Sequence, residues 1–126
     1  NTQNVLKAAD LAIIASGTAT LEALLCECPM VVTYKVPQLT AWLMRRRAQA
    51  TFVSLPNIIA NENLVGEFIQ ERARSDMLAN AVISLFGQPE KLRHVRTRFR
   101  DIKKTLRVGS ANRSADVIQQ FLDMNE

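Results

Sequence analysis

The stretch DLAIIASGTATLEALL, residues 10–25, decides the fold that this sequence predicts. Its first part, residues 10–15, is a short run of β-forming residues. Ser16, Gly17 and Thr18 interrupt that run, and leucines then recur at helical spacing. We therefore expect a strand, a tight turn and a helix in direct succession.

The next segments repeat this alternation of strand and helix. Pro29 ends the first helix, MVVTY at residues 30–34 predicts a second strand, and Pro37 leads into a helix at about residues 39–49. Residues 52–55 form a third short apolar run, which we interpret as a strand buried on both faces. Repeated strand and helix predict an α/β fold with a parallel sheet.

The rest of the chain predicts helices only, so we expect the sheet to end near Glu62. Glycine and proline residues mark the expected boundaries between these helices. The four predicted helices cover residues 64–73, 75–86, 90–107 and 112–124.

Composition narrows the class of protein. The 126 residues are 48% hydrophobic and 22% charged, which is typical of a soluble globular domain. No apolar run reaches the roughly 18 residues that a membrane-spanning helix needs. Cys26 and Cys28 lie too close together to frame a disulfide fold, and no second pair completes a metal site. We expect reduced thiols, no metal and, because the chain lacks an initiator Met, a fragment of a longer protein.

The turn at Ser16, Gly17 and Thr18 is the candidate binding site. In an open α/β sheet, ligands bind at the carboxyl ends of the strands, where the start of a helix directs backbone N–H groups and a positive dipole at them. Gly17 lets the backbone approach a phosphate, and the two neighbouring hydroxyls can donate hydrogen bonds. The pattern favours a diphosphate, but ordinary capping of the helix by Ser16 or Thr18 explains it equally well.

Two more polar residues are candidates for the same site. Glu22 lies one helical turn after Thr18 and could accept hydrogen bonds from a ribose diol. The alternative is an acidic residue that the helix dipole favours in the first turn. Asn57 follows the predicted third strand and would arrive at the same edge of the sheet, unless it only forms an Asx turn.

Three segments, in this order, carry a resemblance to a known family: ASGTATLEALL at residues 15–25, CPMVVTYKV at 28–36 and VSLPNIIAN at 53–61. Together they resemble lipid-A-disaccharide synthase. The resemblance covers most of the chain, although the helical tail matches mainly in layout. It implies a GT-B glycosyltransferase, whose carboxy-terminal Rossmann-like domain holds the UDP of the donor. On this interpretation residues 1–74 are an incomplete Rossmann-like region that binds the UDP-sugar. Residues 75–126 are then carboxy-terminal helices of the same domain that pack between domains or subunits.

The resemblance also implies an activity. Members of the family join UDP-2,3-diacylglucosamine to 2,3-diacylglucosamine 1-phosphate, giving lipid A disaccharide and UDP with inversion and without an obligatory metal, and we expect no cofactor. Carried over residue by residue, Ser16, Gly17 and Thr18 would contact the diphosphate, Glu22 the ribose, and Asn57 would act as a catalytic residue near the donor.

An inverting transfer also needs a general base for the acceptor hydroxyl. The single histidine, His94, falls in a late basic helix, where we expect it to face solvent. We therefore expect the base and the acceptor site to lie outside this chain. The chain alone would then be inactive.

The net charge of +4 is concentrated in one predicted helix, because residues 91–107 carry a local charge of about +7. Interleaved aromatic residues and nucleic-acid motifs are missing from the helix, so we expect no nucleic-acid partner. Its apolar residues are spaced as a seam that is either core or a subunit contact. An alternative function is therefore a helix-mediated assembly module without catalytic activity, and a homodimer is possible. The seam consists of Leu92, Val95, Phe99, Ile102 and Leu106.

A second basic cluster follows an interfacial aromatic residue. Trp42 and two apolar residues precede Arg45, Arg46 and Arg47, an arrangement that suits an anionic membrane surface. The alternative is a helix half packed on the sheet with its arginines in solvent. Because the substrates of the resembling family carry acyl chains, the resemblance favours a cytoplasmic protein peripherally associated with the inner membrane of a Gram-negative bacterium.

Overall fold

The computed structural model describes residues 1–40, 42 and 52–124, and from residue 111 onward it describes the backbone alone. Residues 38–40 and 42 are helical, where the helix at about 39–49 was expected to begin, and most of that helix lies outside the described residues. The named elements, in chain order, are α1 (Thr2–Ala8), β1 (Ala12–Ala15), α2 (Thr18–Leu25), β2 (Met30–Tyr34), α4 (Leu55–Ala60), β3 (Gly66–Ile69), the 3₁₀ turn η1 (Gln70–Arg72), α5 (Ser75–Phe86) and α6 (Pro89–Met124).

The sheet has three parallel strands in the order β1-β2-β3. Ala15 lies opposite Thr33 in the first pair, and Tyr34 lies opposite Ile69 in the second. The central strand β2 is the most buried, and its Val31 and Val32 are 0% and 1% exposed. The predicted α/β class, a Rossmann-like parallel sheet followed by a helical tail, is confirmed. Parallel strands bring their carboxyl ends to one edge of the sheet.

The third strand does not lie where the sequence predicts it. Residues 52–54 are irregular and lead into α4, whereas the expected helix at 64–73 contains β3 and η1 instead. Pro56 suits the first turn of a helix, where its missing N–H has no partner to lose. Gly66 disfavours a helix, and Phe68 and the residues beside it favour a strand, so local propensity and sheet pairing agree on β3.

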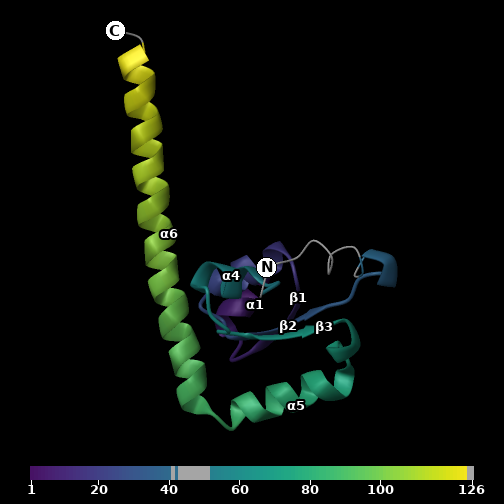
Figure 1. The fold of residues 1–126 in the computed structure, drawn as a ribbon. Coiled ribbons are helices and arrows are strands. Elements are labelled where there is room, and N and C mark those ends of the chain that lie inside the picture. The colour runs from purple at the N-terminus through teal and green to yellow at the C-terminus, as the bar shows by residue number, and fades with distance from the viewer. Residues whose placement is uncertain (41, 43–51, 125–126) are drawn as a thin grey trace.

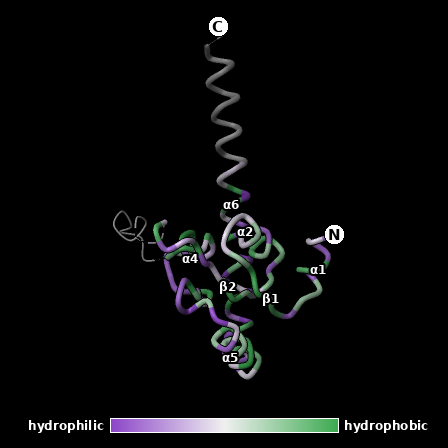
Figure 2. Tube along the Cα trace, turned by 90° about the vertical axis from the view of Figure 1, so that its right-hand side faces the viewer, coloured by the Kyte–Doolittle hydropathy of each residue, from purple (hydrophilic) through white to green (hydrophobic). Residues whose placement is uncertain are grey.

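The helices cover the two faces of the sheet unequally. α1, α2 and α4 lie on one face, α5 lies on the other, and α6 runs past the side of the domain and extends well beyond it (Figure 1). Hydrophobic residues gather where β1 and β2 pass through the middle of the domain (Figure 2). The core is therefore formed between the sheet, α2 and the first half of α6.

α6 is one continuous helix over Pro89–Met124, where the sequence predicts two. Gly109 lies within this helix. A glycine lowers helix stability by about 1 kcal/mol, which is not enough to end the helix there. The first four residues of the predicted seam are buried in this chain, and Phe99 is 0% exposed. Val95, Phe99 and Ile102 pack in the same core as Leu24. These four residues are therefore core of this chain, and the assembly module and homodimer stay predictions.

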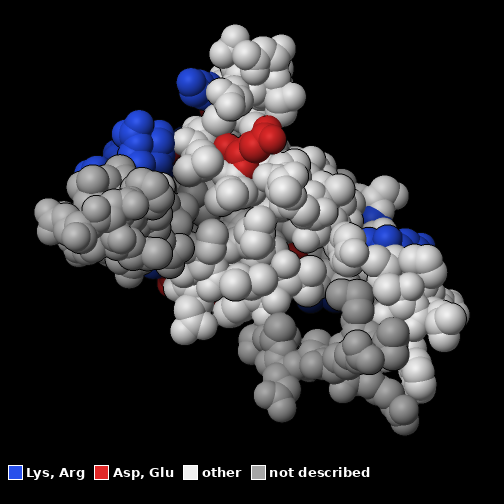
Figure 3. All heavy atoms as spheres, turned by 90° about the horizontal axis from the view of Figure 1, so that it is seen from above, with Lys and Arg blue, Asp and Glu red and all other residues white. Residues whose placement is uncertain are grey.

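Ion pairs attach the basic side of α6 to the loops of the domain. Arg98 Nε lies 2.8 Å from Glu62 Oε1, and Arg100 Nη2 lies 3.0 Å from Glu27 Oε2. Lys103 Nζ lies 3.6 Å from the other oxygen of Glu27. On the face seen from above, Lys and Arg side chains lie in separate groups (Figure 3). Part of the positive charge of this helix is therefore neutralised within the chain.

We predict that Phe99→Ala lowers the free energy of unfolding by about 3–5 kcal/mol, because it leaves a cavity in a close-packed core. Phe86→Ala is the matched control, since Phe86 is 55% exposed, and it should cost less than about 1 kcal/mol. Urea unfolding followed by circular dichroism measures both changes. Equal losses in the two variants would contradict the core position of Phe99.

The Glu27 carboxyl predicts a pH dependence of stability. Burial raises its pKa, but the hydrogen bond and charge of Arg100 and the charge of Lys103 outweigh burial and hold the pKa below the ordinary value of 4.5. A carboxyl whose pKa is lower in the folded state stabilises the fold above its unfolded-state pKa. That contribution is lost as the pH falls through the folded-state pKa.

We therefore expect Glu27→Gln to lower the free energy of unfolding by about 0.5–1 kcal/mol at pH 7, since the side chain is a quarter exposed. The difference from the parent should shrink as the pH falls below 4.5 and through the lower, folded-state pKa. Urea unfolding at pH 7 and at a series of lower pH values measures it, with the exposed Glu90→Gln as control. A difference that persists unchanged at low pH would show that the ion pairs do not act as described.

Candidate functional site

The turn between β1 and α2 has a backbone shape that glycine allows. Gly17 is the N-cap of α2 and has φ 144° and ψ −160°, a conformation that residues with a Cβ rarely adopt. The N–H of Ser16 donates to Thr33 O at 2.9 Å, which continues the pairing with β2 by one residue. The chain therefore stays hydrogen-bonded to the sheet up to Ser16 and turns away from it at Gly17, where α2 begins.

The start of α2 presents polar groups whose hydrogen-bonding capacity is not used by the residues that the structure describes. Gly17 has no side chain to cap the helix, and Gly17 and Thr18 are exposed. Within the part of the chain that the structure describes, the hydroxyls of Ser16 and Thr18 make no hydrogen bond to another protein group. Thr20, by contrast, is buried and donates its hydroxyl to Gly17 O at 2.6 Å, which stabilises the first turn. Open N–H groups, two hydroxyls and the positive end of a helix dipole suit an anion.

Glu22 lies on α2, one helical turn after Thr18, and is exposed. Residues four apart share one face of a helix, so its carboxylate lies on the same side as the Thr18 hydroxyl. The structure thus brings Ser16, Gly17, Thr18 and Glu22 together at the carboxyl end of β1. No ion pair occupies Glu22 among the described residues, which leaves its oxygens as acceptors for a ligand.

Asn57 does not join this group. It lies in α4 and is 0% exposed, and its Nδ2 donates to Val65 O at 2.8 Å. Its Oδ1 accepts from the N–H groups of Leu64 and Val65, both at 2.9 Å. These two residues precede β3, so Asn57 lies level with the amino end of that strand. The premise that a strand at 52–55 carries Asn57 to the carboxyl edge is therefore wrong, and its amide bonds to the backbone.

Sequence reasoning missed two side chains, one in β3 and one directly after it, that hold neighbouring loop segments in place. The Gln70 side chain exchanges two hydrogen bonds with the backbone of Val36, just after β2. The Glu67 carboxylate accepts from the N–H groups of Val53 and Ser54. A helix was predicted here, and only Gly66 beside β-forming residues indicated a strand.

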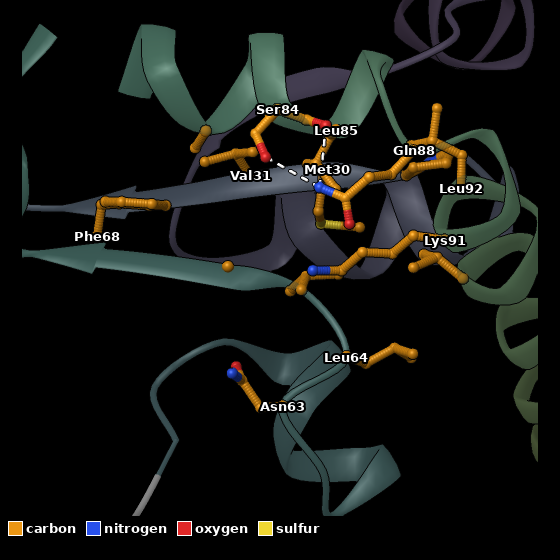
Figure 4. Close-up of a pocket in the computed structure, with 15 residues that line it drawn as sticks. Met30, Val31, Asn63, Leu64, Phe68, Ser84, Leu85, Gln88, Lys91 and Leu92 are labelled. Atoms are coloured by element: carbon orange, nitrogen blue, oxygen red, sulfur yellow. Dashed lines mark hydrogen bonds between the residues drawn. The ribbon is translucent and has the colours of Figure 1, made fainter. Parts of the chain in front are cut away.

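A cavity of about 240 Å³ lies between α5, the start of α6 and the amino ends of β2 and β3. Met30 and Phe68 form apolar walls, and Lys91 lies beside the opening (Figure 4). The Gln88 amide donates to Ser84 O and Oγ at 3.0 and 2.9 Å, which joins the end of α5 to α6. Because the cavity adjoins the first residues of the strands, it lies at the edge of the sheet opposite the turn and is not part of the candidate site.

The two cysteines are free thiols, and burial raises the pKa of the Cys28 thiol. Among the residues that the structure describes, no group of three His, Cys, Asp or Glu side chains is arranged to hold a metal ion. His94 is exposed on α6, as expected. The chemistry open to the turn is therefore that of hydrogen-bond donors, a helix dipole and one carboxylate.

We predict that Asn57→Asp destabilises the fold by about 2–4 kcal/mol at pH 7, because it replaces the donor to Val65 O with a buried oxygen that carries charge. Asn80→Asp, on the exposed side of α5, is the matched control and should change stability by less than about 0.5 kcal/mol. Thermal unfolding measures both. A stability loss no larger than that of the control would contradict the structural role assigned to the Asn57 amide.

Comparison with known proteins identifies the family of this chain. The family model described as lipid-A-disaccharide synthetase matches residues 1–121. The chain is 39% identical over 120 residues to the lipid-A-disaccharide synthase of Chromohalobacter salexigens, covering 95% of the chain and 31% of that protein. It is 43% identical over 114 residues to the enzyme of Alkalilimnicola ehrlichii, covering 90% and 30%. Over 121 residues it is 40% identical to that of Dechloromonas aromatica, covering 96% and 32%. The chain thus spans about a third of the length of these relatives. It belongs to the lipid-A-disaccharide synthase family.

Proposed function

We propose that this chain forms the UDP-binding part of an inverting glycosyltransferase of lipid A synthesis. The reaction would join UDP-2,3-diacylglucosamine to 2,3-diacylglucosamine 1-phosphate, giving lipid A disaccharide and UDP. The observation that carries the proposal is the open start of α2, where Gly17 leaves the helix uncapped beside two hydroxyls that have no protein partner among the described residues. Family membership supports the reaction class.

The proposed role of the turn is to stabilise the leaving group. In an inverting transfer, the acceptor hydroxyl oxygen bonds to the anomeric carbon while the bond from that carbon to the diphosphate oxygen breaks. Negative charge then builds on the departing UDP, and a base takes the acceptor proton. The N–H groups at the start of α2, with the hydroxyls of Ser16 and Thr18, would stabilise that charge because they are held in place before the reaction. The base would come from residues outside this chain.

Glu22 is proposed to bind the ribose. A carboxylate has two acceptor oxygens, which match the two hydroxyl donors of a ribose diol. Its exposure on the same face of α2 as Thr18 supports a ligand that extends from diphosphate to ribose along the helix. Asn57 would act on this site indirectly, because its amide holds α4 against the segment before β3.

Peripheral contact with the inner membrane is also proposed, with the protein on its cytoplasmic side. Of the helices in the described part of the chain, none is long and apolar enough to span a membrane. Leu39 is 78% exposed and Trp42 is 52% exposed, which suits a surface that meets lipid headgroups. The three arginines at residues 45–47, on which the expected basic cluster depends, lie outside the described residues.

The ribose contact gives a direct test with UDP and 2′-deoxy-UDP. We expect the parent protein to bind UDP roughly tenfold more tightly, because the deoxy nucleotide leaves one Glu22 oxygen unpaired. Glu22→Gln should lose most of this preference, whereas Glu90→Gln, which changes an exposed carboxylate at the start of α6, should keep it. Backbone amide NMR shifts during each titration give the dissociation constants.

Two results would count against these assignments separately. A Glu22→Gln protein that keeps the full preference for UDP would remove the ribose role of Glu22. A parent protein whose amide signals at residues 16–22 do not respond to UDP would contradict the proposed function itself.

A further inference from the structure

β3 and the residue after it hold both ends of the connection that leads from β2 to α4. At one end, Val36 N–H donates to Gln70 Oε1 at 2.7 Å, and Gln70 Nε2 donates to Val36 O at 3.1 Å. At the other end, Ser54 N–H donates to Glu67 Oε2 at 2.6 Å. Val53 N–H lies 3.1 Å from both oxygens of the same carboxylate. Side chains three residues apart therefore fix backbone segments that are seventeen residues apart, from Val36 to Val53.

The chemistry of each side chain matches its backbone partners. Val36 presents one N–H and one carbonyl, and an amide is the side chain that can pair with both. Val53 and Ser54 present two N–H groups at the start of α4, and a carboxylate accepts both while it complements the helix dipole. Ser54, the N-cap, does not cap the helix itself, and its buried Oγ has no partner among the described residues. Glu67 supplies the acceptor that this helix lacks locally.

Each fixed segment is linked to the proposed nucleotide site through one element, β2 in one case and α4 in the other. Val36 follows β2, and Thr33 of that strand accepts the N–H of Ser16 in the turn. Ser54 begins α4, which packs against α2. A displacement of either segment is therefore transmitted to the strand end or to the helix that forms the site. Gln70 itself has φ 54°, a left-handed conformation that places its side chain back over the end of β2.

From these contacts we propose that Glu67 and Gln70 are positioning residues of the nucleotide site, an inference that rests on the proposed function. They touch no ligand in this scheme. Gln70 holds the backbone after β2 at the carboxyl edge, and Glu67 holds the start of α4, the helix that packs against α2. In this proposal the affinity for UDP depends on both placements.

Isosteric exchanges test the inference with little change in volume. Gln70→Glu keeps the acceptor for Val36 N–H but sets an oxygen against Val36 O. Glu67→Gln sets an NH₂ group against one of two N–H donors. We expect each exchange to raise the UDP dissociation constant about fivefold to tenfold and to speed hydrogen exchange at the backbone N–H that loses its acceptor.

Matched controls make the same chemical changes away from the site. Gln88→Glu alters an amide that also donates to a backbone carbonyl, but at the opposite edge of the sheet. Glu90→Gln alters an exposed ion pair on α6. Both controls should leave the UDP dissociation constant within about twofold of the parent. All titrations are run at a temperature where the amide spectra of β1 and β2 match the parent, so that lost stability alone does not change the affinity.

If an isosteric variant fails to fold, Gln70→Asn and Glu67→Asp replace it, because they shorten the reach without reversing the hydrogen-bonding chemistry. Unchanged UDP affinity in folded variants at both positions, with faster exchange at Val36 and Ser54, would overturn the positioning role and leave the proposed function intact. Unchanged exchange at these amides would overturn the contacts themselves. A parent that binds no UDP would overturn the proposed function, and the positioning role with it.

Discussion

The parallel pairing of β2 with both of its neighbours is the constraint on which the rest of this domain depends. Because all three strands run the same way, the residues after β1, β2 and β3 meet at one edge of the sheet. The same pairing requires connections that cross back over the sheet, and these place α2 and α4 on one face (Figure 1). The open start of α2 at that edge, with Gly17 as its N-cap, is a direct consequence.

Short strands create a second requirement, which polar side chains meet. β1 and β3 have four residues each, so the ladder ends before the neighbouring loops are paired. Buried backbone groups must still find partners. Asn57, Glu67 and Gln70 provide them, each bonding with its side chain to backbone groups of another segment. Their side-chain hydrogen bonds hold the loop backbone in place where no strand pairing is available.

The basic helix α6 carries buried apolar residues on one side and charged residues on another. Its apolar stripe closes the core around Phe99, while Arg98, Arg100 and Lys103 pair with acidic residues of the loops. A run of like charges would repel itself in isolation, and the carboxylates of Glu27 and Glu62 relieve that repulsion where the helix meets the domain. Part of the positive charge of α6 therefore holds this helix to the loops of the same chain through ion pairs.

The sequence by itself determined the α/β class, the strand, turn and helix at residues 10–25, and the family, because period-two and helical patterns and the glycine turn are local signals. It could not place the third strand. The apolar run at 52–55 reads as a strand in isolation, and the weak strand signal of Gly66 and Phe68 gains its meaning only from pairing with β2. Tertiary structure likewise decided that Asn57 is buried against Val65, that Phe99 is core and that Glu67 and Gln70 hold the loops. The contacts of Phe99, Glu67 and Gln70 join segments far apart in sequence, and those of Asn57 depend on where β3 begins, so no local pattern encodes them.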